Sequence, residues 1–229
     1  MNKYIFFIFL LLLSFCSLNG QKIGFGIKLG LNDAKIIGFK NSESITSYNF
    51  GVFSEFKFIE KFSIQQELNF SRNQLKMPPS GYFLFNYESI EDDKIDVNYI
   101  NVPILAKFLI NKNICMYFGP QINFLISANQ SSTKQIFDAA KDPLSSFFMS
   151  PKYERLNNDF KPFFSPVDYS FSLGLMIPIT QKFAIDFRFS EGLNNINKSK
   201  KNDAFVNSVQ LNTLILKNRA SQINLQYRF

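Results

Sequence analysis

Hydrophobic and polar residues alternate strictly over the last nine positions of the chain, 221–229. The apolar side chains are Ile223, Leu225, Tyr227 and Phe229, and the polar ones between them are Gln222, Asn224, Gln226 and Arg228. A period of two predicts a β-strand with one apolar face. In water this face needs a packed partner and the strand edge favours aggregation, whereas in a closed barrel the face contacts lipid and the edge disappears. The pattern therefore favours a membrane β-barrel.

Seven further segments repeat this period. They lie at 23–31, 48–58, 62–72, 96–109, 114–126, 169–177 and 183–189. With the last strand they make eight, and single-chain bacterial barrels require an even number. We therefore predict an all-β fold, an eight-stranded antiparallel up-and-down transmembrane β-barrel. The polar phase of the strands predicts seven charged side chains inside it, namely Lys28, Glu55, Lys57, Glu67, Lys107, Asp186 and Arg188.

Two prolines fall inside the predicted strands. Pro103 argues against an ordinary central strand, because proline has no N–H to donate to a neighbouring strand. Pro120 indicates a β-bulge in the next strand.

The connections between the predicted strands alternate in length. Long links lie at 33–47, 73–95, 127–166 and 193–217, and tight turns lie at 59–61, 110–113 and 180–182. With both termini on the periplasmic side, this order predicts short periplasmic turns and long extracellular loops, as in outer-membrane barrels.

The first twenty residues have the three parts of a secretory signal. A basic residue comes first, an apolar run covers 4–15, and small residues follow as far as Gly20. We predict a cleaved signal peptide at 1–20 and a barrel domain at 21–229. A lipoprotein signal centred on Cys16 is the alternative, which the bulky Phe15 disfavours.

The formal charge of +7 becomes +6 once residues 1–20, with one Lys and no acid, are removed. Nucleic acid is not a predicted partner, because the short basic run Lys198, Lys200 and Lys201 fits a solvated loop. No stretch after the signal reaches the roughly eighteen apolar residues of a spanning helix. A soluble secreted protein and an outer-membrane barrel are then the two open locations. For a barrel, 29 Phe and 9 Tyr could form the aromatic girdles without Trp.

The chain contains no His, which excludes a Ser/His/Asp arrangement, Cys/His catalysis and His-based metal sites. After signal cleavage Cys115 is the only cysteine, so no intramolecular disulfide can form. Gly24, Gly26 and Gly30 do not form a phosphate loop, because no helix follows them. We assign no catalytic residue, cofactor-binding residue, metal ligand or cofactor, and predict that the protein is not an enzyme.

One dense acidic cluster lies in the link at 73–95 and just beyond it, at Glu88, Glu91, Asp92, Asp93 and Asp96. It is either a solvated loop or a weak divalent-cation site with hard oxygen ligands.

An eight-stranded barrel is only wide enough for side chains to fill its interior. We predict a lumen plugged by ion pairs, because an unpaired charge in a dry interior is costly. The alternative is a thin polar channel for small solutes. Six of the apolar side chains in the link at 127–166 either pack on the barrel rim or form a docking surface for a protein partner: Phe147, Phe148, Met149, Phe160, Phe163 and Phe164.

Four segments and the terminal YRF carry a family resemblance. The segments are GFGIKLGLN (24–32), YINVPILAKF (99–108), YFGPQINFLIS (117–127) and IDFRFSEGLNNI (185–196). In this order they resemble the PorT-like outer-membrane β-barrel proteins of Bacteroidetes, a "porin family". The resemblance implies an eight-stranded barrel in the cell outer membrane. Its partners would be outer-membrane lipid and the barrel-assembly machinery, which reads a C-terminal strand ending in an aromatic residue, here Phe229. It implies no activity, although the family's namesake takes part in gliding-associated (type IX) secretion.

The function predicted from the sequence is that of a non-enzymatic integral outer-membrane barrel with external loops for interaction. A narrow pore for small solutes is the first alternative, and an accessory of a type IX secretion system is the second.

Overall fold

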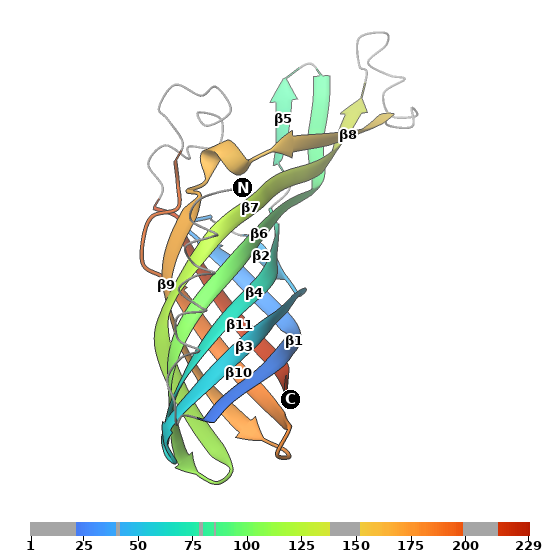
Figure 1. The fold of residues 1–229 in the computed structure, drawn as a ribbon. Coiled ribbons are helices and arrows are strands. Elements are labelled where there is room, and N and C mark those ends of the chain that lie inside the picture. Colours follow the sequence, from blue (N-terminus) through green and yellow to red (C-terminus); the bar gives the residue numbers. More distant parts are fainter. Residues whose placement is uncertain (1–21, 40–41, 78–79, 85, 138–151, 199–214) are drawn as a thin grey trace.

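The computed structural model of the chain describes residues 22–39, 42–77, 80–84, 86–137, 152–198 and 215–229. Eight antiparallel strands form a closed ring (Figure 1). In ring order they are β1 (Lys22–Ile37), β3 (Ser47–Ile59), β4 (Phe62–Lys76), β6 (Asn86–Asn111), β7 (Ile114–Phe137), β9 (Val167–Pro178), β10 (Phe183–Gly192) and β11 (Lys217–Arg228). The last strand closes on the first, with Leu29 opposite Leu225. The predicted barrel is thus confirmed.

Three short strands and one 3-10 turn complete the described part. They are β2 (Glu43–Ile45), β5 (Ser80–Leu84), β8 (Lys152–Asp159) and η3 (Lys161–Phe163). None of the helices in the described residues is long and apolar enough to cross a membrane.

The outer surface of the ring is an apolar belt. Alternate residues on the strands are mostly large hydrophobic side chains that face outward, and many are about half exposed, such as Phe25, Ile27, Leu29 and Leu31 on β1. The phases expected for β7, β9, β10 and β11 are observed. Stacked or tilted rings cross four strands from Phe62 through Phe108 and Phe118 to Phe171, with centroids 5.0–6.2 Å apart. Such a face is stable against lipid rather than water.

The long links proved to be partly strand, which corrects the prediction of long loops. β6 and β7 have 26 and 24 residues, far more than the roughly 9–11 that span a bilayer. Beyond the belt the pattern inverts: Leu75, Ile95 and Val97 point inward and are 0–2 % exposed. The inversion follows from the surroundings, because a strand that leaves lipid for water must turn its apolar residues inward.

Both prolines lie inside central strands, and each interrupts the pairing with one neighbouring strand without shifting its register. The β4–β6 pairing is interrupted around Pro103, between Gln66 opposite Ile104 and Asn69 opposite Asn101. The β6–β7 pairing is interrupted beside Pro120 with no change of register, so the predicted bulge there is wrong. Each proline lacks an N–H and so loses a hydrogen bond to only one of the two neighbouring strands. Pairing with the other neighbouring strand is kept, so the strand continues through the proline.

Candidate functional site

The interior of the barrel is the candidate site, and its centre is a cluster of four charged side chains. Glu67 accepts hydrogen bonds from Lys28 at 2.8 Å and from both terminal nitrogens of Arg188 at 2.8 Å each. Asp186 lies 3.9 Å from the Lys28 ammonium and 3.5 Å from Arg188. All four side chains are at most 1 % exposed. Two bases and two acids balance in charge, as removal from water requires.

Uncharged groups complete the bonding of both acids. Gln65 and Asn69 donate to Glu67 at 2.6 and 2.7 Å. Asp186 accepts from Asn224 at 2.9 Å and from the Tyr117 hydroxyl. The Tyr117 hydroxyl in turn accepts from Arg188 Nε at 3.1 Å. These side chains come from β4, β7, β10, β11 and β1, so the network ties together strands that are not neighbours in the ring.

Six of the seven charged side chains that the sequence predicted inside the barrel are buried there. Lys28, Glu55, Glu67, Lys107, Asp186 and Arg188 are each at most 4 % exposed and each has an ion-pair partner. The seventh, Lys57, is exposed and lies at the mouth of the lumen. Tyr117 was not predicted as part of the network, although it shares the inward phase of β7 with Cys115 and Gln121.

Gly174 makes room for the Tyr117 ring. A Cβ atom at this position would overlap that ring and the carbonyl oxygen of Phe187. Gly174→Ala is therefore expected to lower the free energy of unfolding by about 1–3 kcal/mol, the usual cost of overpacking. The control is Gly24→Ala, whose Cβ would meet only the end of Arg228, at 3.4 Å. Denaturant unfolding of both variants in lipid vesicles measures the difference, and equal losses would contradict the assignment.

An apolar plug lies above the charged cluster, toward the long connections. It consists of buried residues that pack together: Ile36, Leu75, Ile95, Val97, Tyr99, Leu125, Ala128, Phe160, Phe164, Ile196 and Leu216. Phe160 and Phe164 flank η3 and are 4 and 3 % exposed. Packing at the rim is therefore confirmed for them and for Phe163, which packs against the plug. The predicted docking residues Phe147, Phe148 and Met149 lie outside the described residues.

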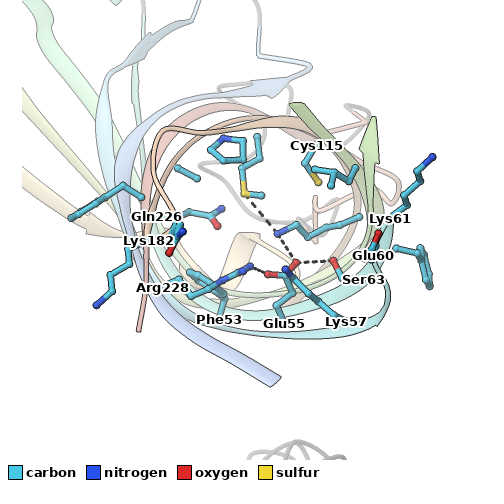
Figure 2. A pocket seen from close by; sticks show the side chains of 18 of the residues that line it. Phe53, Glu55, Lys57, Glu60, Lys61, Ser63, Cys115, Lys182, Gln226 and Arg228 are labelled. Carbon is cyan, nitrogen blue, oxygen red and sulfur yellow. Dashed lines mark hydrogen bonds and ion pairs between the residues drawn. The ribbon is translucent and has the colours of Figure 1, made fainter. Parts of the chain in front are cut away.

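A cavity of about 130 Å³ lies at the opposite end of the lumen, beside the tight turns. Its floor holds Glu55, which accepts one hydrogen bond from Ser63 at 2.7 Å and lies 3.2 Å from Lys107 Nζ. Arg228 forms a second ion pair with Glu55, and Figure 2 shows Arg228 and Ser63 reaching this carboxylate from either side. Lys107 also donates to Gln65 at 2.7 Å. Among the described residues, the lumen is thus apolar at one end, charged and filled in the middle, and hollow at the other end.

The structure separates the acidic cluster into residues with different partners. Asp93 accepts from Gln130 at 2.7 Å, and Asp96 forms an ion pair with Arg72 at 3.1 Å. Burial raises the pKa of Asp93 above its ordinary value. Within the described ranges, no group of three His, Cys, Asp or Glu side chains is placed to hold a metal ion.

The sequence model of a family described as "Outer membrane protein beta-barrel domain" matches residues 18–198. The chain belongs to this family. It is therefore an outer-membrane β-barrel protein, and the ring of strands in Figure 1 is the barrel domain that the family description names. No curated protein sequence matches it.

Solved barrels resemble this protein in fold alone. Ail, the attachment invasion locus protein of Yersinia pestis, is 14 % identical, with 90 % of this chain and 98 % of that chain covered and a TM-score of 0.43. Neisserial surface protein A is 10 % identical, with 90 and 97 % covered and a TM-score of 0.48. The CymD monoaromatic hydrocarbon channel is 8 % identical, with 90 and 71 % covered and a TM-score of 0.36.

Proposed function

We propose that this protein is a sealed, non-enzymatic outer-membrane barrel that carries a projecting β-sheet for contact with a protein partner outside the cell. The observation that carries the sealed lumen is the neutral, fully buried cluster of Lys28, Glu67, Asp186 and Arg188 beneath an apolar plug. A solute would have to separate 2.8 Å ion pairs that span the lumen. The absence of His from the sequence supports a role without catalysis.

The projecting sheet supports the role in interaction. Beyond the ring, β5 pairs with β6, β6 with β7 and β7 with β8 (Figure 1). Every residue of β8 except Leu156 is exposed, and among the described residues β8 pairs only with β7. An edge strand with open backbone groups is a template on which a partner strand can add. The protein partner expected for 127–166 would bind here.

Within the family, we propose that this protein is a PorT-like barrel and that its signal peptide, residues 1–20, is cleaved. The four resembling segments fall mainly in β1, β6, β7 and β10, which supports a shared barrel design. The tight turns would then lie in the periplasm and the projecting sheet outside the cell. The barrel-assembly machinery would insert the chain through β11 and Phe229.

The test places a photoreactive amino acid on the proposed surface in living cells. Substituted at Glu154 or Asn157 of β8, it is expected to give a discrete protein adduct on illumination. The control is Lys112, which is exposed in a tight turn at the other end of the barrel. Adducts of the same size and yield from all three positions, or none from β8, would overturn the proposed interaction surface.

A further inference from the structure

The cavity beside the tight turns has an unbalanced charge. Seven charged side chains line it, five basic and two acidic, which gives a net charge of +3: Lys57, Lys61, Lys107, Lys182, Arg228, Glu55 and Glu60. The central cluster is neutral by comparison. Concave sites with one predominant charge and apolar walls focus the electric field and concentrate counter-ions.

Part of this charge is already used within the cavity. Glu55 is shared between Lys107 and Arg228, so those three groups together keep one positive charge. Lys182 lies over the Tyr227 ring, 5.9 Å from its centroid. Lys57 and Lys61 have no ion-pair or hydrogen-bonded side-chain partner among the residues that the structure describes. The β1–β3 register sets a further basic residue, Lys22, opposite Lys57. The bases at the mouth are therefore available to a ligand.

The walls suit a small ligand with several acceptor oxygens. Phe53, Leu109 and Met176 give the cavity apolar sides, while Thr180 and Gln226 add polar groups near the bases. The volume of about 130 Å³ holds a few water molecules or one small anion. A single carboxylate would leave most of the positive charge uncompensated, whereas a phosphate group carries more charge and is commonly bound by Lys.

We propose that this cavity binds a phosphate group. Free inorganic phosphate and the headgroup of an anionic phospholipid share the required chemistry. Lys182 and Tyr227 lie on the rim near Phe183, whose ring is 5.0 Å from that of Tyr227, so aromatic side chains and bases occur together where lipid headgroups would lie.

The experiment titrates inorganic phosphate into the full chain in phosphatidylcholine nanodiscs at constant ionic strength. Saturable binding of one phosphate is expected. The combined change Lys57→Gln, Lys61→Gln and Lys182→Gln should weaken it by about tenfold or more, or about 1.4 kcal/mol, because it removes three of the five bases that line the cavity. The matched control, Lys94→Gln with Lys161→Gln and Lys198→Gln, removes the same charge at the other end and should leave the affinity unchanged.

A second arm distinguishes the two sources. In nanodiscs that also contain phosphatidylglycerol, weaker phosphate binding identifies a lipid headgroup as the competitor, and unchanged binding identifies free phosphate as the ligand. Both outcomes support the site. The absence of saturable binding in phosphatidylcholine discs would overturn it, as would equal losses in the two triple variants. Lys57→Gln alone, at an exposed position, guards against a folding defect in the triple variant.

Discussion

Glu67→Gln is expected to lower the free energy of unfolding by about 3–5 kcal/mol, because it leaves Lys28 and Arg188 buried with Asp186 as the only counter-charge in their cluster. Adding Lys28→Met restores neutrality by leaving Arg188 against Asp186, 3.5 Å apart. The double variant should therefore recover most of the loss. The free energy of unfolding of the unaltered protein, the single variant and the double variant is measured by denaturant titration in lipid vesicles, with heat-sensitive gel mobility as the readout of the folded fraction.

An exposed pair of the same chemistry is the control for this prediction. Glu191 accepts hydrogen bonds from Arg219 at 2.6 and 2.9 Å, but both side chains are at least one-third exposed. Glu191→Gln should have a much smaller effect, since water solvates the remaining charge. If the two single variants were equally destabilised, the account of the lumen as a dry, charge-balanced interior would be wrong.

Leu29→Arg is expected to cost about 2–4 kcal/mol in a bilayer, although Leu29 is 63 % exposed. In a water-soluble protein, a polar substitution at so exposed a position changes stability by no more than about 0.5 kcal/mol. The difference arises because the apolar belt on β1 faces lipid, where a guanidinium is poorly solvated. Folding into vesicles, measured as the folded fraction across a urea series, gives the effect.

The control for the belt is Ile215→Arg. Ile215 is 64 % exposed but precedes β11 at the end of the barrel with the long connections. Its substitution should be tolerated in the same assay. A tolerated Leu29→Arg would place β1 outside the hydrocarbon region, against the family assignment.

The eight strands and the inward charges were predictable because lipid and lumen impose opposite preferences on alternate residues. Phe50 and Val52 could only face outward, and Glu55 and Glu67 only inward, once the period was recognised. The same rule failed beyond the belt, where the outer face contacts water. There Ile95, Val97 and Tyr99 point inward, while Ile100 and Ile104 of the same strand point outward.

Because the apolar residues of β6 change from the inner to the outer face, the strand is apolar on both faces for a few residues. Its true length is therefore not apparent from a simple alternation of apolar and polar residues. A sequence signal does exist: the apolar phase of β7 changes between Ile126 and Ala128, next to the register shift at Leu125 and Ser127. The cavity beside the turns could not have been predicted in the same way. Its lining comes from five separate stretches of the chain, which include Lys57, Lys107 and Arg228, and these stretches meet only when the ring closes.

The apolar plug depended on residues that the sequence assigned to a loop. The sequence indicated that Phe160 and Phe164 pack on the barrel rim or dock a partner, but it did not indicate which residues they contact. The inward residues that receive them, such as Leu75 and Ile196, lie on segments predicted to be links.

Single-channel recording in a planar bilayer tests the central claim most directly. The full chain, inserted at neutral pH, is expected to give no steady current, because the Lys28, Glu67, Asp186 and Arg188 cluster and the plug above it fill the lumen. A steady, reproducible single-channel current from the unaltered protein would contradict the sealed barrel and favour a narrow pore.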